Sequence, residues 1–286
     1  MKVILFSSFI GLLMIGCSES SSPSDPVDSP QAIDLEDKQT RDKIIAEAID
    51  KESLTKPKKG ELVIFDKNGQ TPYSGWTKAT YPNGKIRVLS QLRDGKPDGL
   101  LTKWYENGQM KMKINYKNGK QTGQSTVWYE NGQKRAEVNY KDAKPHGLST
   151  SWYETGQKES KGNFKDGKME GLVKRWRKTG LMSEEGYWID GKIMSVVMWK
   201  PDGEKCSHTN LKNGNGLVTG YYDNGQRTGV GKHMGGRFMS AIVFKPNGEK
   251  CPVTNLRNGN GVVVWYDEEG SEKSRRNFKN GEQFLD

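Results

Sequence analysis

The chain has few of the residues from which catalytic and metal sites are most often built. Its 286 residues include three cysteines and three histidines, the latter being His146, His208 and His233. Cys206 and His208 could both bind a metal, but Val253 stands where the matching histidine would follow Cys251, and no second ligand pair has zinc-site spacing. Phosphate-binding loops, nucleophile elbows and His-Glu helix motifs are also missing. We therefore predict a protein that is not an enzyme, with no catalytic residue, metal or cofactor.

The chain also lacks an apolar run long enough to cross a bilayer. Val3 to Ile15 is shorter than the roughly 20 residues that a spanning helix needs. Lys2 precedes this run, and Gly16-Cys17 follows it, which resembles a bacterial lipoprotein signal peptide covering residues 1–16. The resemblance implies cleavage before Cys17 and lipidation of that residue by palmitate-like chains. It places the protein at the cell envelope, with the outer membrane favoured in a cell with two membranes. The alternative is an ordinary secretory signal with an incidental cysteine.

Basic residues outnumber acidic ones in most of the chain, but not near its start. The net charge is +10 and Lys2 contributes +1, whereas residues 17–56 carry ten acidic and five basic side chains, so residues 57–286 carry +14. A basic surface attracts anionic lipid headgroups or envelope polymers. The alternative is that lysines line polar strand faces and protect sheet edges against aggregation. Nucleic acid is not an expected partner for a protein outside the cytoplasm.

Residues 17–34 have the Ser, Pro and Asp bias of a disordered tether. In residues 35–56, Ile44, Ile45, Ala48 and Ile49 recur at helical spacing. We predict a short helix and a linker here, the helix running from about Leu35 to Leu54. It should cover the first repeat, because the end of a repeat array needs a cap.

What the chain has in abundance is regularity. Trp104, Trp128, Trp152 and Trp176 stand 24 residues apart, and several series of glycines keep the same step. A fixed short period indicates a repeat array, here over residues 57–190. Each unit of such an array packs mainly on its neighbours. The tryptophans are then either repeat core or a binding surface.

Within a repeat, two short strands alternate with two glycine turns. Met112, Ile114 and Tyr116 alternate with lysine and asparagine, the period-two pattern of a strand with one apolar face. Asn107-Gly108 predicts a type I′ hairpin turn, and Asn118-Gly119 a second turn. The predicted fold class is therefore all-β, a repetitive antiparallel hairpin meander. We expect an extended, curved single-layer sheet, because open twisted sheets rarely exceed about ten strands without curling.

From residue 191 the period lengthens to 45, as the match between residues 194–216 and 239–261 shows. We predict that residues 191–286 form two doubled hairpins with longer strands. Cys206 and Cys251 occupy equivalent positions in these two units. Four strands at about 4.8 Å each would place them about 19 Å apart, beyond the reach of a disulfide. Buried free thiols or an intermolecular bridge are better expectations.

The strings WYENGQ (104–109 and 128–133), WYETGQ (152–157) and NYKNGK (115–120) resemble bacterial variants of MORN repeats. They are most similar to the group catalogued as toxin–antitoxin system YwqK-family antitoxins, a resemblance that covers about residues 60–286. It implies protein scaffolding, dimerisation or lipid binding and supplies no catalytic residue.

These observations favour a non-enzymatic, membrane-anchored binding or scaffolding module at the cell envelope. Its partner would be a protein, an anionic envelope polymer or a lipid surface. One alternative is an immunity-like antitoxin that binds a secreted toxin. Another is an envelope enzyme acting on glycans, which would need two carboxylates facing each other across a cleft.

Overall fold

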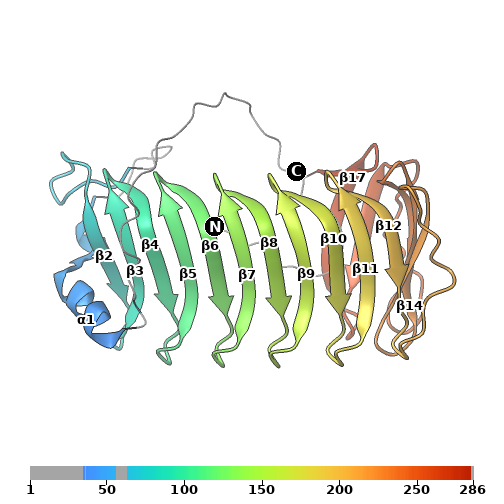
Figure 1. Ribbon diagram of the computed structural model, residues 1–286, viewed down its shortest axis with the longest axis horizontal. Coiled ribbons are helices and arrows are strands. Elements are labelled where there is room, and N and C mark those ends of the chain that lie inside the picture. Colours follow the sequence, from blue (N-terminus) through green and yellow to red (C-terminus); the bar gives the residue numbers. More distant parts are fainter. Residues whose placement is uncertain (1–34, 36, 56–62, 285–286) are drawn as a thin grey trace. The chain divides into compact units, whose positions relative to one another are not determined.

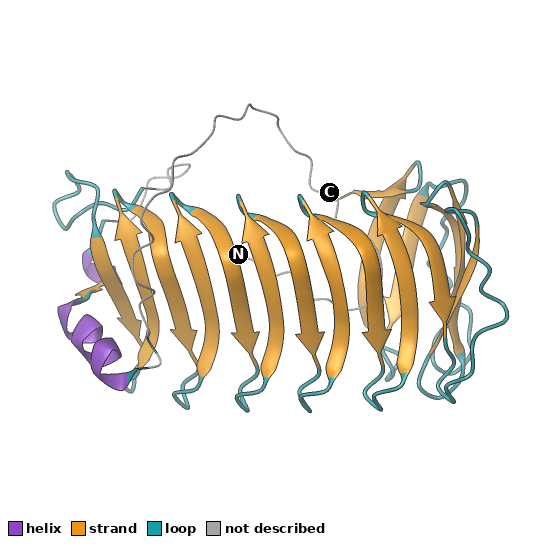
Figure 2. Ribbon diagram, in the orientation of Figure 1, coloured by secondary structure: helices purple, strands orange, loops and turns teal. Residues whose placement is uncertain are grey.

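The computed structural model describes residues 35, 37–55 and 63–284, which are mostly strand (Figures 1 and 2). The predicted signal peptide, Cys17 and the predicted tether lie outside the described residues. The strands are β1 (Ile49–Asp50), β2 (Gly75–Thr80), β3 (Ile86–Arg93), β4 (Lys96–Trp104), β5 (Met110–Lys117), β6 (Lys120–Trp128), β7 (Lys134–Lys141), β8 (Lys144–Trp152), β9 (Lys158–Lys165), β10 (Lys168–Trp176), β11 (Met182–Ile189), β12 (Lys192–Met198), β13 (Gly216–Tyr221), β14 (Arg227–Met234), β15 (Arg237–Val243), β16 (Gly261–Tyr266), β17 (Glu272–Lys279) and β18 (Glu282–Phe284).

The predicted all-β meander is confirmed. Strands β1 to β12 form one sheet in chain order, and the last six strands form two three-stranded sheets, β13–β14–β15 and β16–β17–β18. Neighbouring strands are antiparallel, except that β1 pairs with β2 in parallel. The described residues up to Lys144 form one compact unit and those from Pro145 form another. The two units are described separately below.

The two turns of a repeat have different geometries, and the type I′ prediction for the first is wrong. Gly108 has φ +92°, but Asn107 is not among the described residues with positive φ. The Gly108 N–H donates to the Tyr105 carbonyl, and the Tyr105 N–H donates to the Gln109 carbonyl. This is a three-residue loop in which glycine takes the left-handed position of a bulge, so only one positive φ is needed. Asn118 (φ 47°) and Gly119 (φ 78°) form the two-residue type I′ turn instead.

Alternation gives the sheet two different faces. Tyr116 pairs with Gly99 and lies on what we call the column face, because a large side chain recurs at this repeat position. The members of that column are Leu92, Tyr116, Tyr140, Phe164, Trp188, His233 and Phe278. Leu100 and Trp104 alternate with Gly99 along β4 and lie on the opposite side, which we call the tryptophan face. The burial of Tyr116 and Tyr140 raises the pKa of both phenols.

Helix α1 (Lys38–Glu47) covers the tryptophan face of the first repeats. The Asp37 carboxylate accepts the Thr40 N–H at 2.7 Å and caps the helix N-terminus. Ile44, Ile45 and Ala48 pack in a cluster with residues of β3 and β4 that include Leu100. The predicted cap is therefore present. The helix is shorter than predicted, because the chain becomes extended at Ala48 and forms β1 and a 3₁₀ turn at Lys51–Ser53.

The long units differ from the predicted doubled hairpins. Where four strand-length runs were expected, the first unit has three, β12, β13 and β14, of seven, six and eight residues. Residues 199–215 form a loop with two isolated bridges. Side chains of this loop accept hydrogen bonds from backbone N–H groups of β13. The Asn210 carboxamide oxygen accepts the Leu217 N–H, and the Thr209 hydroxyl oxygen accepts the Thr219 N–H. A second strand pair cannot form where side chains replace the ladder partner.

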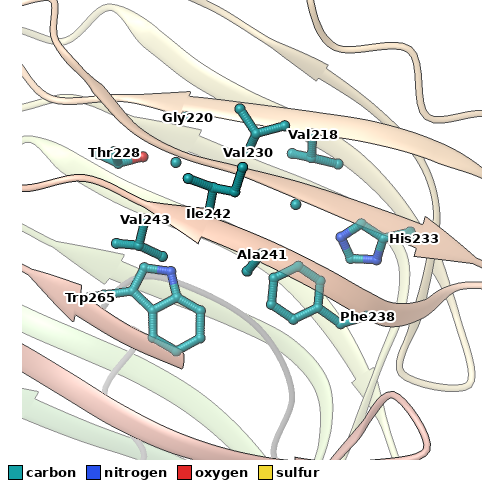
Figure 3. Close-up of a pocket in the computed structure, with 12 residues that line it drawn as sticks. Val218, Gly220, Thr228, Val230, His233, Phe238, Ala241, Ile242, Val243 and Trp265 are labelled. Carbon is teal, nitrogen blue, oxygen red and sulfur yellow. The ribbon is translucent and has the colours of Figure 1, made fainter. Parts of the chain in front are cut away.

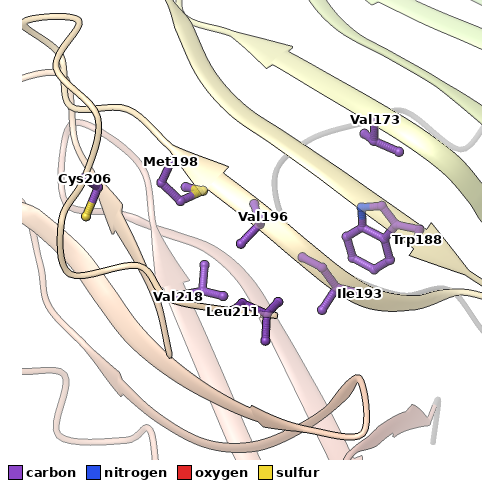
Figure 4. Packing of buried hydrophobic residues seen from close by; sticks show 8 residues of the cluster. All are labelled: Val173, Trp188, Ile193, Val196, Met198, Cys206, Leu211 and Val218. Carbon is purple, nitrogen blue, oxygen red and sulfur yellow. The ribbon is translucent and has the colours of Figure 1, made fainter. Parts of the chain in front are cut away.

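Two apolar clusters hold the unit that begins at Pro145. One joins Val173 and Trp188 to residues of β12, β13 and the loop, among them Cys206 and Leu211 (Figure 4). The other joins side chains of the second long unit, among them Cys251 and Leu256, which are equivalent to Cys206 and Leu211, and it also includes Phe278. The loop of each long unit therefore supplies core residues in place of the missing strand.

Candidate binding surfaces

The four tryptophans of the 24-residue series do not have equal surroundings. Trp104 is only 4% exposed and belongs to the cluster that α1 covers. Trp128, Trp152 and Trp176 are only partly buried. Trp104 is thus core, while the other three present part of each ring to solvent.

A tyrosine that recurs every 24 residues, as at Tyr81, Tyr105 and Tyr153, joins one repeat to the next. The Tyr81 hydroxyl donates to the Trp104 carbonyl at 2.8 Å, and the Tyr105 hydroxyl donates to the Trp128 carbonyl at 2.9 Å. Tyr153 makes the same bond to Trp176. A backbone carbonyl at each repeat boundary is therefore satisfied by the neighbouring repeat, so these recurrent polar groups serve the fold.

Arg177 takes the place of this tyrosine where the period changes. Its side chain is buried, and its guanidinium donates to the carbonyls of Trp199 and Tyr221 and to the Asp223 carboxylate, the last at 2.6 Å. A fork of several donors can reach carbonyls that a single hydroxyl cannot. The substitution therefore fits the wider step from the short to the long units.

Cys206 and Cys251 are free and buried, in line with the argument from strand spacing. The Cys206 thiol lies 3.4 Å from the Tyr221 hydroxyl, and the Cys251 thiol lies 3.2 Å from the Tyr266 hydroxyl. Burial by itself raises the pKa of both thiols, but the hydrogen bonds from tyrosine and threonine outweigh it and leave both below the usual value. The recurrence of the same contacts in both units indicates a structural role.

His233 is the one titratable imidazole in the aromatic column. Its side chain is 2% exposed, stacks on Phe238 with ring centroids 4.9 Å apart, and has no partner for Nδ1 among the described residues. Burial lowers its pKa to about 4. It lines a cavity of about 30 Å³ together with Val218, Ala241 and Trp265 (Figure 3). Sequence reasoning listed this histidine but missed its place in the column, which the 24- and 45-residue periods together would have revealed.

Carboxylates do not gather at any of these places. Glu106, Glu130 and Glu154 are exposed in the turns, and the Glu106 carboxylate accepts the Asn83 side-chain amide. Among the described residues no group of three His, Cys, Asp or Glu side chains could hold a metal ion. His146 lies beside Asp166, and His208 beside Arg227, both on the surface.

A basic groove of about 1170 Å³ lies between the sheet β13–β14–β15 and the loop 250–261. Lys232, Lys250 and Arg257 line it, and no acidic residue is among its described lining residues. None of the three cations has an ion-pair partner in the described part of the chain. Leu217 and Ile242 supply apolar floor and are partly exposed. The groove therefore combines an apolar base with uncompensated positive charge.

The tryptophan face of the unit from Pro145 is the second exposed surface. Leu172 of β10 and Tyr187 of β11 are direct cross-strand partners and are 46% and 48% exposed. Next to them, the Lys174 ammonium and the Glu185 carboxylate form a surface ion pair at 2.8 Å. Trp176 pairs with Met182 beyond it. The result is a polar pair between two apolar pairs.

With this geometry in hand, three stretches of the chain can be assigned. Residues 97–118, 121–142 and 145–166 match the family model of the MORN repeat variant. Three copies of the 24-residue unit therefore match that repeat. The match suggests a repeat module for binding or scaffolding that is not enzymatic. No curated protein matches the chain.

Among solved structures, the chain is similar to an alternansucrase in complex with isomaltononaose, at 15% identity and a TM-score of 0.14. The likeness covers 73% of this chain and 18% of that one, so the chain spans under a fifth of that protein's length. A TM-score this low carries no argument. In the part of the chain that the structure describes, no helix is long and apolar enough to cross a membrane.

Proposed function

We propose that the protein is a binding and scaffolding module, held at the cell envelope by lipid on Cys17, that uses its basic groove to bind an anionic envelope polymer or lipid surface. The groove carries this proposal: three exposed cations stand over an apolar floor, and no acidic residue is among the described residues that line the groove. The charge of +14 over residues 57–286 adds long-range attraction to the same partners.

The first long unit offers a matched control for this groove. Lys205 and Lys212 stand 45 residues before Lys250 and Arg257 and are equally exposed, but they do not line the groove. Removing charge at either pair changes the net charge by the same amount. Any difference between the two pairs therefore reports the groove rather than the overall charge.

The test is a titration of the mature protein against anionic vesicles and purified cell-wall fragments at several salt concentrations. Each lysine or arginine near an anionic surface contributes about 1 kcal/mol, so replacing Lys250 and Arg257 by Gln should weaken vesicle binding by about thirtyfold, and replacing Lys232 as well by about a hundredfold. The double replacement of Lys205 and Lys212 should weaken it far less. Binding should also fall steeply with salt, because exposed charges are screened beyond about 8 Å at physiological ionic strength. Equal effects of the two sets of variants, or no binding to either material, would refute the groove as the site.

A protein partner is the second candidate, and the exposed Leu172–Tyr187 pair favours it. An immunity-like antitoxin that docks a secreted toxin belongs to this class. A pull-down from solubilised membranes followed by mass spectrometry separates the two candidates. One stoichiometric protein that stays bound at high salt would favour the protein partner over the anionic surface.

A further inference from the structure

The hairpin β2–β3, which carries α1, recurs four repeats later as the hairpin β10–β11. The cross-strand pairs of the first hairpin are Trp76–Gln91, Lys78–Leu89 and Thr80–Ile86. Those of the second hairpin, at the same repeat positions, are Leu172–Tyr187, Lys174–Glu185 and Trp176–Met182. Both hairpins therefore place a lysine between apolar side chains on the tryptophan face.

In the first hairpin, this arrangement binds a helix. Trp76 and Ile86 pack against the same buried cluster as Ile44 and Ile45 of α1. The Lys78 ammonium donates to the Ile45 carbonyl at 2.8 Å, in the last turn of the helix. A cation at this end satisfies an orphan carbonyl and interacts favourably with the helix dipole. Lys78 thus fixes where the helix ends on the sheet.

The exposure of leucine at one repeat position shows how much of the tryptophan face the helix covers. Leu100, in the cluster with α1, is 7% exposed, whereas Leu148 and Leu172 at the equivalent position are 42% and 46% exposed. The residue type and strand position are the same in all three repeats. The burial of Leu100 therefore comes from what packs on it, and β8 and β10 expose the same apolar surface.

We infer that the hairpin β10–β11 is a docking site for an amphipathic helix of a partner protein, bound as α1 is bound on β2–β3. Leu172, Tyr187 and Met182 receive the apolar stripe of the helix, and Lys174 donates to a carbonyl of its last turn. Lys174 is free to do so, because its exposed ion pair with Glu185 is of a kind that contributes little. Glu185 stands where Leu89 lies in the first hairpin, so the helix carries a basic residue at that point.

This inference rests on the proposal that the protein is a binding module, and it names a partner and a surface for it. The probe is a fluorescein-labelled peptide with the sequence of residues 35–49, which has the isoleucine stripe and the basic residues of α1. We expect saturable binding to the full mature chain, measured by fluorescence anisotropy. The peptide with Ile44 and Ile45 replaced by Ser should not bind.

The double variant Leu172→Ser, Tyr187→Ser should weaken peptide binding at least tenfold, and Lys174→Gln should weaken it severalfold. Leu181→Ser should leave it unchanged, since Leu181 is similarly exposed but lies in the turn before β11. Binding that persists in the double variant would mean that the peptide only replaces α1 on β2–β3, and the inference would be wrong. Absence of saturable binding to the wild-type chain would overturn it as well.

Sedimentation of the chain alone tests whether a second copy of the chain, rather than a partner helix, occupies the site. A dimer that Leu172→Ser, Tyr187→Ser dissociates would make a second copy the occupant and would refute a partner helix; a wild-type chain that stays monomeric fits the inference. The vesicle titration is independent of these variants. If the wild-type chain does not bind the peptide but still binds vesicles through Lys232, only the helix site is refuted. If it binds the peptide but does not bind vesicles, only the anionic groove is refuted.

Discussion

Stability should depend on pH through one buried side chain, His233. The imidazole is enclosed in the aromatic column and has a pKa of about 4, against 6.5 for an exposed histidine. The unfolded chain therefore takes up a proton at pH 5 to 6 that the folded chain does not. Because the pKa of His233 is lower in the folded chain than in the unfolded chain, its contribution to the free energy of unfolding is fully present above about pH 6.5 and is lost as the pH falls towards 4.

The size of the effect follows from the shift. A difference of about 2.5 pH units corresponds to about 3 kcal/mol once both forms have titrated, and about 2 kcal/mol of this is lost between pH 7 and pH 5. Urea unfolding followed by tryptophan fluorescence at these two pH values measures it. Carboxylates also titrate in this range, so the informative quantity is the difference between the wild type and a variant without the imidazole.

The repeat itself supplies that variant. Phe278 occupies the equivalent position one long unit later and is as deeply buried as His233, so His233→Phe fits the column. It should remove about 2 kcal/mol from the stability difference between pH 7 and pH 5. If His233→Phe unfolds with the same pH dependence as the wild type, the imidazole titrates normally and the argument from burial fails.

Three further changes test other parts of the molecule. Cys17→Ser should release the protein to the soluble fraction or leave it unprocessed, as cell fractionation and palmitate labelling would show; correct trimming and acylation of the variant would contradict the anchor. Trp104→Ala should lower the free energy of unfolding in urea by about 3–5 kcal/mol, the range for a buried aromatic. Trp128→Ala should lower it clearly less, since Trp128 is only partly buried; equal losses would show that α1 does not protect Trp104. Tyr105→Phe should cost about 1 kcal/mol for the lost bond to the Trp128 carbonyl, and no change in unfolding would show that this bond does not join the repeats.

Much of the fold could be predicted because it is written in local periods. The alternation that ends in Ile114 and Tyr116 needs no tertiary information, and both side chains are buried as that pattern predicts. The glycine turns at Gly108 and Gly119 are equally local. Even so, the type predicted for the turn at Gly108 is wrong. Asn-Gly occurs in both two- and three-residue loops, and only the register of the flanking strands decides between them.

The long units were harder because side chains compete there with strand pairing. Asn210 and Thr209 take over backbone donors that a fourth strand would have satisfied, and the apolar residues of the loop, such as Leu211, enter the core. A run of strand-forming residues cannot by itself reveal this competition. The change of period at residue 191 was visible, but not its structural consequence.

The exposed surfaces could not be predicted at all, because the repeats that differ in exposure are nearly the same in sequence. Leu100 and Leu172 share a strand position, a residue type and the tryptophans that follow them, yet one is core and the other is surface. What separates them is a segment distant in sequence, α1, which covers one hairpin and not the other. In an array of similar units, the surface available to a partner therefore depends on which units another segment of the chain covers. Lys78 and Lys174 make this concrete, since the same side chain fixes a helix in one repeat and pairs with a surface carboxylate in the other.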